Sequence, residues 1–402
     1  MGTLIKFMDY NVSELTTKAL QAAIDFAESS GGGRVVVEPG VHECHGIILK
    51  SNVELHLMAG ARLVGSENPD DIPDFNPPGL ESIRPDFTQK CLIACANAEN
   101  VSITGEGMVD GLGTTYYNHN ARLYPDFDFW ERTDKQRPRL IEFYNCRNVN
   151  LQGFTLKDSP GWTMWLTHCQ DVHINAIKID GNQHMITDGI DLNCCQRVTI
   201  RDCFIRTGDD CISIRAMRRH KEEIAVTEQI LVSNCTLDSG CQCVRIGCPS
   251  DDTIRHVIFH GVTMLGQNNG IFCEGSLYYL RPDDTGYLHA HNIMFNDIII
   301  ECPRQAIGIV IDSGLTLRGI HDFSFNNIQI KSGNAIRLEG NVKTPLENIS
   351  FNHVSGTVSA MPEPIVTKYV KNLRFTDFDI TATNGPAESL QRIQSASWEA
   401  CK

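Results

Sequence analysis

Ten residues, Arg147-Asn148-Val149-Asn150-Leu151-Gln152-Gly153-Phe154-Thr155-Leu156, carry apolar side chains at their third, fifth, eighth and tenth positions. Apolar residues that alternate with polar ones predict a strand with one buried face. The phrase recurs along the chain, with its third position at Val172, Val198, Ile230, Val257, Ile293, Phe323, Ile349 and Leu373. The chain therefore repeats one strand-based unit over much of its length.

The spacing of the copies indicates that these units stack. The step from Val149 to Val172 is 23 residues, and the step from Val257 to Ile293 is 36 residues. Units of this length bury their apolar faces on their neighbours. Leucine-rich repeats would also show a helix and a Leu–Asn frame in each unit, and neither is present. We therefore predict an all-β fold, a right-handed parallel β-helix filled by stacked apolar columns.

The predicted β-helix forms a single domain over residues 1–402. Residues 1–33 are expected to be an N-terminal cap region, because a helical pattern through Leu20 and Ile24 stops at Gly31-Gly32-Gly33. The aromatic stretch 68–138 is expected to be one long loop inserted over the surface of the β-helix. Such loops often shape a binding site.

The composition excludes several classes of function. The formal net charge is −14, which argues against nucleic acid or an anionic membrane as a partner. No run approaches the roughly 18 apolar residues of a membrane-spanning helix. The N-terminus shows no signal peptide, and the 16 cysteines in a chain of this length are interpreted as reduced thiols. These features predict a cytoplasmic protein.

Two short runs carry the candidate chemistry: Thr187-Asp188-Gly189-Ile190-Asp191 and Gly208-Asp209-Asp210-Cys211-Ile212. Asp188 and Asp210 hold the same position in successive repeats, so stacking should place them about 4.8 Å apart. Carboxylates clustered on one wall of a scaffold suit acid–base cleavage of a glycosidic bond. Both aspartates share parity with buried residues, so we expect Gly189 and Gly208 to bend the chain and turn them outward.

Alignment of the following strands predicts further columns of side chains. The outward column contains Asp191, Ser213, Arg245 and Phe272, and the next column contains Asn193, Arg215, Gly247 and Glu274. Gln242 should stack on Asp210, and Trp165 could offer a flat face to a sugar ring. The candidate substrate contacts are Gln242, Arg245, Glu274, Trp165 and Arg215.

Structural alternatives accompany these candidates. The aspartates could bond local backbone in turns, as they do in non-catalytic β-helices. Asp191 is better explained as holding a turn or a neighbouring cation. Arg245 could form an exposed ion pair of little energetic value, and Trp165 could simply pack.

The two runs resemble the signatures of glycoside hydrolase family 28, the polygalacturonases. The phrases 31–37, 49–57 and 158–162 are also similar to that family's framework, so the resemblance extends from about Leu15 to Lys371. It implies an inverting hydrolase in which Asp209 is the general acid and Asp188 and Asp210 activate the attacking water. Like charges this close should keep one carboxyl protonated near neutral pH. The sequence leaves open which aspartate holds the proton.

The chain departs from that family's pattern at three places. The family's Asn-Thr-Asp begins here with Ile186, and its Gly-His-Gly is Cys241-Gln242-Cys243. Its Arg-X-Lys, which clamps the uronate carboxylate, is Phe272-Cys273-Glu274. The loss of two cations disfavours galacturonate in that subsite, although Arg245 or Arg215 could be a relocated anchor.

The resulting hypothesis is a glycoside hydrolase that cleaves pectin-type oligosaccharides from plant cell walls, exo-acting, with galacturonate disfavoured. The first alternative is a β-helical polysaccharide lyase, in which Asp209 and Asp210 would bind calcium. The second is a non-catalytic glycan-binding β-helix. Zinc on Cys241, Cys243 and Cys248 is disfavoured by their spacing, so no metal or cofactor is expected. The sequence leaves the oligomeric state open.

Overall fold

The structure is a computed structural model that describes residues 16–80, 88–122, 130–181, 184–277, 287–360, 362–384 and 393–400. The chain is a right-handed parallel β-helix, as predicted. It forms two compact units, an N-terminal unit of Met1–Ile190 with Val198–Gly208 and a C-terminal unit of Asp191–Arg197 with Asp209–Lys402. Each unit is described by itself, and the single-domain organisation stays a prediction.

The N-terminal unit repeats three short strands in each turn, and the strands of successive turns pair in parallel. The first strands are β1 (Gly33–Val37), β4 (Val53–Leu57), β7 (Glu99–Gly105), β12 (Arg147–Gln152) and β15 (Gln170–Asn175). The second strands are β2 (Gly40–Glu43), β5 (Ala61–Val64), β8 (Met108–Asp110), β13 (Thr155–Lys157), β16 (Lys178–Asp180) and β19 (Phe204–Thr207). The third strands are β3 (Ile47–Leu49), β6 (Cys91–Ala96), β11 (Arg139–Tyr144) and β14 (Met164–Thr167). Strands β17 (Ile190–Asn193) and β18 (Gln196–Arg201) have residues in both units.

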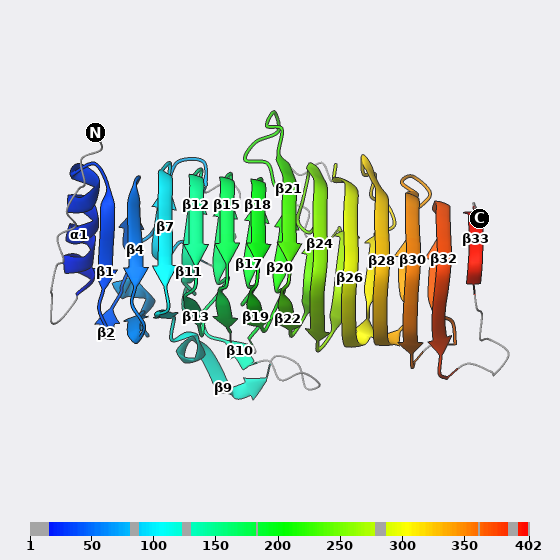
Figure 1. Ribbon diagram of the computed structural model, residues 1–402, viewed down its shortest axis with the longest axis horizontal. Coiled ribbons are helices and arrows are strands. Elements are labelled where there is room, and N and C mark those ends of the chain that lie inside the picture. Colours follow the sequence, from blue (N-terminus) through cyan, green and yellow to red (C-terminus); the bar gives the residue numbers. More distant parts are fainter. Residues whose placement is uncertain are drawn as a thin grey trace. The chain divides into compact units, whose positions relative to one another are not determined.

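Helix α1 (Thr17–Ser29) packs on the first strands of this unit, beside β1 in Figure 1. The Thr16 side chain accepts a hydrogen bond from Ala19 N and caps the helix. Leu20 and Ile24 are fully buried, as the helical pattern predicted. The Gln21 side chain also bonds both backbone groups of Ile48, which ties the helix to β3. The helix therefore covers the apolar end of the core, whereas residues 1–15 of the predicted cap region lie outside the described residues.

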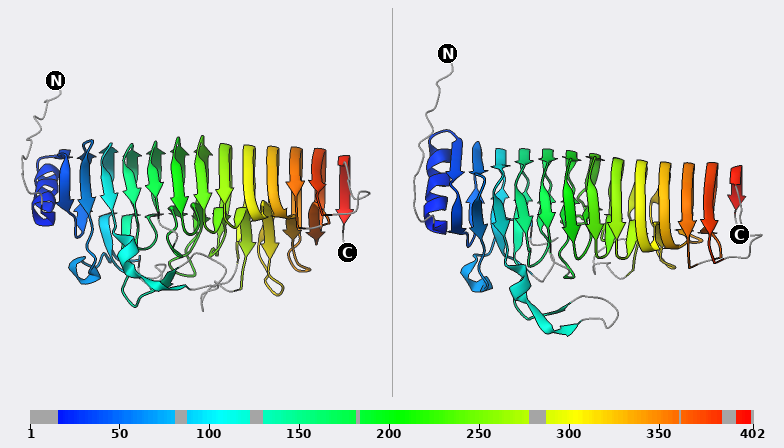
Figure 2. Two further views of the ribbon diagram at one scale, coloured as in Figure 1. Left: turned by 90° about the horizontal axis from the view of Figure 1, so that it is seen from below. Right: turned by 60° about the horizontal axis from the view of Figure 1, so that its bottom comes forward.

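The predicted loop over 68–138 is wrong in its extent, because a turn of the β-helix interrupts it. Strands β6, β7 and β8 occupy 91–110 and pair with the turns on either side. Their apolar residues are buried, so this segment belongs to the core. The stretch around it contains two 3-10 helices and the antiparallel pair β9 (Tyr117–Arg122) and β10 (Trp130–Arg132), which Figure 2 shows extending from the stacked strands. Residues 81–87 and 123–129 lie outside the described part.

The C-terminal unit lengthens the repeated strands and keeps two sheets. One sheet contains β21 (Val226–Ser233), β22 (Thr236–Ser239), β24 (Thr253–Gly266), β26 (His289–Gln305), β28 (Gly319–Asn334), β30 (Leu346–Val358), β32 (Val370–Ala382) and the antiparallel β33 (Ile393–Ala400). The other, called the site sheet below, contains β20 (Ile212–Arg215), β23 (Gln242–Ile246), β25 (Asn269–Gly275), β27 (Ile307–Ile311), β29 (Ile336–Glu339) and β31 (Ile365–Lys368). Figure 1 shows β24 to β32 side by side.

The register confirms the repeat that the sequence predicts. Equivalent third positions pair directly from Ile230 through Val257, Ile293, Phe323 and Ile349 to Leu373. The fifth positions form a ladder of phenylalanine rings inside the core. Neighbouring rings along Phe259, Phe295, Phe325, Phe351 and Phe375 stack with centroids 4.8 to 5.6 Å apart. In-register pairing turns one apolar position into a continuous column.

Asparagines at the corners form a second kind of ladder, which the sequence analysis did not predict. Asn52, Asn100 and Asn148 have positive φ of 61°, 57° and 54°. Asparagine tolerates this left-handed conformation better than most residues. The Asn148 side chain donates to Asn100, and Asn100 donates to Asn52, at 2.7 and 2.8 Å. Asparagine thus both adopts the left-handed conformation of the corner and forms the side-chain hydrogen bond to the next turn.

Two further features of the described residues concern cysteines and helices. The 15 cysteines in this part of the chain are free thiols, and 14 of them are buried.

Within the described residues, no helix has both the length and the apolar character needed to cross a membrane.

The phenylalanine ladder gives a test of the fold. Phe325 is fully buried between Phe295 and Phe351, so we expect Phe325→Ala to lower the free energy of unfolding by about 3 to 5 kcal/mol through loss of packing. Urea denaturation followed by circular dichroism measures the change. Phe26→Ala is the control, because Phe26 is 46% exposed on α1. Equal stability of the two variants would contradict the stacked core.

Candidate active site

The site sheet of the C-terminal unit aligns the predicted columns. Ile212 pairs with Val244, and Val244 pairs with Ile271, all of them fully buried. On the opposite side, Ser213 pairs with Arg245 and Arg245 pairs with Phe272, which confirms the predicted outward column from Ser213 to Phe272. Cys211 N also donates to Gln242 O, so the chain around Asp210 lies beside the start of β23. The register thus brings Ser213, Arg245 and Phe272 onto one face of one sheet.

Asp210 occupies the outward face but is almost completely covered. Its Oδ2 accepts hydrogen bonds from Ser213 Oγ at 3.3 Å and from Arg245 Nη1 at 3.4 Å. The residue is only 1% exposed, so it does not project into solvent as the sequence analysis expected. Its Oδ1 is also buried, without a hydrogen-bond partner among the described residues, and is available to a water or a sugar hydroxyl.

The surroundings of Asp210 favour its protonated form. Burial raises the pKa of Asp210 to about 7, Arg245 and Arg215 oppose this rise, and the negative charges of Asp209 and Asp191 add to it. The pKa of Asp210 therefore lies where a carboxyl can hold a proton near neutral pH. Asp210 is therefore the candidate for the carboxyl that is expected to stay protonated near neutral pH.

Asp209 lies next to Asp210 and is more exposed. One carboxylate oxygen of each residue and Cys241 Sγ lie within 4.8 Å of one another. The Asp209 carbonyl oxygen accepts a hydrogen bond from Ser239 Oγ at 2.7 Å, which fixes the turn that presents the pair. Two carboxylates and one thiol offer fewer oxygen ligands than Ca²⁺ takes. Burial raises the pKa of Cys243 and Cys248, which keeps both thiols protonated and weakens them as zinc ligands.

Arg245 bridges two carboxylates rather than facing solvent. It forms ion pairs with Asp210 and with Glu274, and its side chain is only 11% exposed. The sequence analysis allowed an exposed ion pair or a substrate contact, and the structure shows a buried ion pair instead. The physical reason is the register, which places Arg245 beside Asp210 and Glu274 where its charge offsets theirs. Arg245 therefore brings little net positive charge to the site.

Arg215 is also committed to an internal partner. Its Nη1 lies 3.0 Å from Asp191 Oδ1, and the two side chains are 4% and 0% exposed. This confirms the interpretation of Asp191 as a residue that holds a neighbouring cation. The pair is sealed beside Asn193, whose Oδ1 accepts from Met217 N. Arg215 accordingly does not reach the surface in this structure.

Gln242 stands where the related motif has histidine, and it is 8% exposed. Its Oε1 is buried and has no hydrogen-bond partner in the described part of the chain. A buried amide oxygen of this kind prefers a donor such as a sugar hydroxyl or a protonated carboxyl. Gln242 can therefore accept a hydrogen bond at the site but cannot act as an acid or base at neutral pH.

Asp188 belongs to the N-terminal unit and is described there. Its carbonyl oxygen accepts from Thr163 N at 2.8 Å, and the next carbonyl, of Gly189, accepts from Met164 N. The residue is 3% exposed. These bonds hold the Asp188 backbone against the turn that leads into β14, before β17 begins.

The turn that precedes Asp188 contains Ile186 in a left-handed conformation. Ile186 has a φ of 65°, whereas neither Gly189 nor Gly208 has a positive φ. This conformation is strained for a β-branched residue. Gly189 and Gly208 do lie in bends of the chain before β17 and β20 begin, as expected, although neither bend uses a positive φ. The strain is held in place by Thr187, whose hydroxyl donates to His184 O and accepts from Gly208 N.

An aromatic stack supports the same turn, and the sequence analysis missed it. The rings of Tyr117 and His184 are parallel within 12° and 3.8 Å apart. The Tyr117 hydroxyl contacts the carbonyl oxygens of Pro160 and Met185 at 2.8 and 3.0 Å. Burial lowers the pKa of His184 to about 4, so its ring is neutral at pH 7. No sequence pattern links Tyr117 to His184, because the contact depends on how the insertion folds back.

Trp165 does not offer its ring to solvent. The residue is fully buried, with the Arg139 guanidinium 4.2 Å from its ring centroid and Trp162 packed edge-on. Arg139 in turn pairs with the buried Glu142 at 3.2 Å. This burial agrees with the packing alternative rather than with a sugar platform, because a cation already occupies a face of the ring.

One family model matches most of the chain, including the residues of the candidate site. The model of the family described as glycosyl hydrolases family 28 matches residues 83–397. The chain belongs to this family. The match includes both aspartate runs, the site sheet and the turn at Ile186.

The sequence identity between this chain and individual relatives is low. A probable polygalacturonase of Arabidopsis thaliana is 26% identical over 45% of this chain and 42% of its own length. A probable exopolygalacturonase B of Aspergillus terreus is 25% identical over 71% of this chain and 62% of its own length. The matches thus span about half of these curated relatives. The solved structure of a hyperthermoactive exopolygalacturonase from Thermotoga maritima has a TM-score of 0.76 at 18% identity, covering 98% of this chain and 95% of that chain, which shows the shared fold.

The strained residue before Asp188 gives the first test of the site. We expect Ile186→Asn to raise the free energy of unfolding by about 1 kcal/mol, because asparagine relieves the strain at positive φ. Thermal denaturation measures the change. Ile186→Val is the matched control, since it keeps the β-branch and should bring no gain. A loss of stability in Ile186→Asn would contradict strain at this position.

The buried carboxyl gives the second test. Between the ordinary pKa of aspartate and about 7, only the folded chain keeps the proton on Asp210, so the free energy of unfolding falls as the pH rises through this range. We expect the melting temperature to drop from pH 5 to pH 8, and to drop less in Asp210→Asn. Differential scanning fluorimetry at both pH values measures it. An equal drop in the two proteins would assign the pH dependence to other groups.

Proposed function

We propose that this protein hydrolyses O-glycosidic bonds in pectin-type oligosaccharides from plant cell walls by an inverting acid–base mechanism. The observation that supports this most strongly is the Asp209–Asp210 pair, in which a half-covered carboxyl lies beside a buried one whose pKa is raised to about 7. A pair that carries one proton near neutral pH provides both the acid and the base that glycoside hydrolysis requires. Membership of family 28 supports the same reaction class.

The roles follow from exposure and charge. Asp209 is the more accessible carboxyl, and in this proposal it protonates the leaving glycosidic oxygen as the bond to the anomeric carbon breaks. Asp188 and Asp210 take the proton of the water that attacks the opposite face of the sugar. Asp210 holds the proton of the pair in the free enzyme, and in this proposal the proton passes to Asp209 when the substrate binds, which leaves Asp210 ionised to act as a base. The Gln242 amide oxygen orients a sugar hydroxyl.

The charge around the pair bears on the sugar that is cleaved. Arg245 is paired with both Asp210 and Glu274, and Arg215 is paired with Asp191. Neither cation is left to clamp a uronate carboxylate next to the cleaved bond. We therefore propose a neutral sugar at this position, with galacturonate disfavoured there.

The mode of cleavage is proposed as exo. The Aspergillus terreus relative and the Thermotoga maritima structure are both named as exopolygalacturonases, which supports release from a chain end. Cytoplasmic placement also remains a proposal, and it would favour short imported oligosaccharides over polymer.

The direct test is hydrolysis of a panel of cell-wall oligosaccharides, followed by proton NMR of the fresh product. We expect the first anomer to have the configuration opposite to that of the cleaved bond. Asp209→Asn should lower kcat by at least about 10²-fold, because it removes the general acid. Asp377→Asn is the matched control and should leave kcat unchanged, since this exposed carboxylate on β32 pairs with His353 of β30, away from the site sheet.

Three results would contradict the proposal. Retention of configuration would exclude the inverting mechanism. Unsaturated products that absorb ultraviolet light and disappear on addition of a chelator would assign the protein to the lyases. Binding without turnover, unaltered in Asp209→Asn, would indicate a glycan-binding protein.

A further inference from the structure

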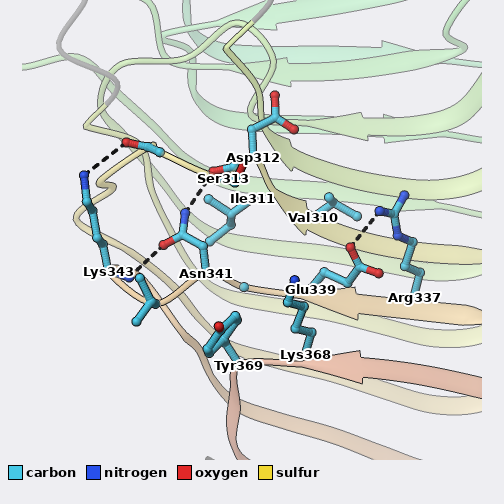
Figure 3. A pocket seen from close by; sticks show the side chains of 13 residues that line it. Val310, Ile311, Asp312, Ser313, Arg337, Glu339, Asn341, Lys343, Lys368 and Tyr369 are labelled. Atoms are coloured by element: carbon cyan, nitrogen blue, oxygen red, sulfur yellow. Dashed lines mark hydrogen bonds and ion pairs between the residues drawn. The ribbon is translucent and has the colours of Figure 1, made fainter. Parts of the chain in front are cut away.

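A pocket of about 420 Å³ opens on the site sheet at β27, β29 and β31 (Figure 3). Its charged lining residues are Arg337, Glu339, Lys343, Lys368 and Asp312. Figure 3 shows Glu339 and Lys368 on neighbouring strands, with Arg337 beside Glu339. None of these residues was singled out in the sequence.

The register places this pocket on the same face as Asp210. Phe272 pairs with Gly308, and Gly308 pairs with Arg337, which extends the outward column of Ser213 and Arg245. In the next column, Glu274 pairs with Val310, then Glu339 and Lys368. From β20 to β29 there are four steps between strands, or about 19 Å. A glycan of several residues lying across the strands could therefore reach both places.

The balance of charge in the pocket is positive. Arg337 pairs with Glu339 at 2.6 Å, and Lys368 also lowers the pKa of Glu339, so three cations lie with two carboxylates in the pocket lining. The Asp312 carboxylate already accepts from Ser276 Oγ and Leu277 N. Asn341 fixes the wall, because its side chain bonds Asp312 O, Leu315 O, Lys343 N and Thr344 N. Lys368 Nζ lies 5.6 Å from the Tyr369 ring centroid.

An aromatic ring lies between the pocket and the aspartates. A Cβ on Gly308 would come within 2.6 Å of Phe272 Cδ2 and Cε2, so the Phe272 ring lies over the glycine. The missing side chain lets the ring approach the backbone of β27. Phe272 is partly exposed and presents a flat apolar face, which suits the face of a pyranose ring.

We propose that this pocket is a distal subsite that binds the carboxylate of a uronic acid residue, and that Phe272 supports a sugar between it and the aspartates. Lys368 supplies the charge-assisted hydrogen bond to the carboxylate. The cations near the cleaved bond are neutralised, whereas those of the pocket are in excess. The substrate class is therefore a mixed glycan, neutral where it is cut and acidic several residues away. This inference rests on the proposed function for its orientation toward the aspartates.

Binding to the full-length Asp209→Asn protein tests the subsite. The probes are hexagalacturonate and its neutral methyl ester, measured by isothermal titration calorimetry. We expect the acid to bind at least tenfold more tightly than the ester, and Lys368→Gln to remove most of this preference. Lys331→Gln is the matched control, because Lys331 is exposed on β28 outside the pocket and its loss changes the net charge equally.

Equal affinities for acid and ester, or an equal loss in Lys331→Gln and Lys368→Gln, would overturn the subsite. Lys368 is exposed, so an unchanged melting temperature should accompany the loss of binding. Hydrolysis by the wild-type protein is scored separately. A preference for the acid that depends on Lys368, found without hydrolysis, would reject the proposed function and keep the subsite. Hydrolysis without that preference would reject the subsite and keep the proposed function.

Discussion

The in-register parallel pairing of successive turns is the constraint on which the rest of the structure depends. Each residue on a strand meets the equivalent residue of the next turn, so any choice at one position becomes a column. On the inner side the columns are apolar, and the phenylalanine ladder of the C-terminal unit is their clearest case. On the outer side of the site sheet the same pairing aligns Ser213, Arg245 and Phe272.

The same pairing explains the electrostatics of the site. A carboxylate covered by neighbouring turns loses hydration, which raises its pKa unless a cation compensates. At Asp210, Arg245 compensates only in part, because it is shared with Glu274. At Asp191, the Arg215 guanidinium lies 3.0 Å from the carboxylate, and the two buried side chains form an ion pair. Two neighbouring positions of one scaffold thus hold a carboxyl that retains its proton and a carboxylate with its own cation.

The sequence predicted what periodicity encodes and missed what depends on chain folding. The anchors from Ile230 to Leu373, helix α1 and the outward column were all predictable, because each follows from a repeat or a cap signal. The Tyr117–His184 stack and the burial of Trp165 under Arg139 were not, since they depend on contacts without a sequence period. The predicted loop over 68–138 failed because the short apolar strand β6 lies inside an aromatic, irregular stretch.

Direct titration of Asp210 tests the central claim, that burial on the site sheet keeps a proton on this carboxyl near neutral pH. Carbon-13 NMR of the aspartate carboxyl groups, assigned with Asp210→Asn, reports its titration midpoint. We expect a midpoint near pH 7 that falls in Asp209→Asn, because Asp209 contributes to the rise in the pKa of Asp210. A midpoint near the ordinary aspartate value of about 3.9, unaffected by Asp209, would contradict it.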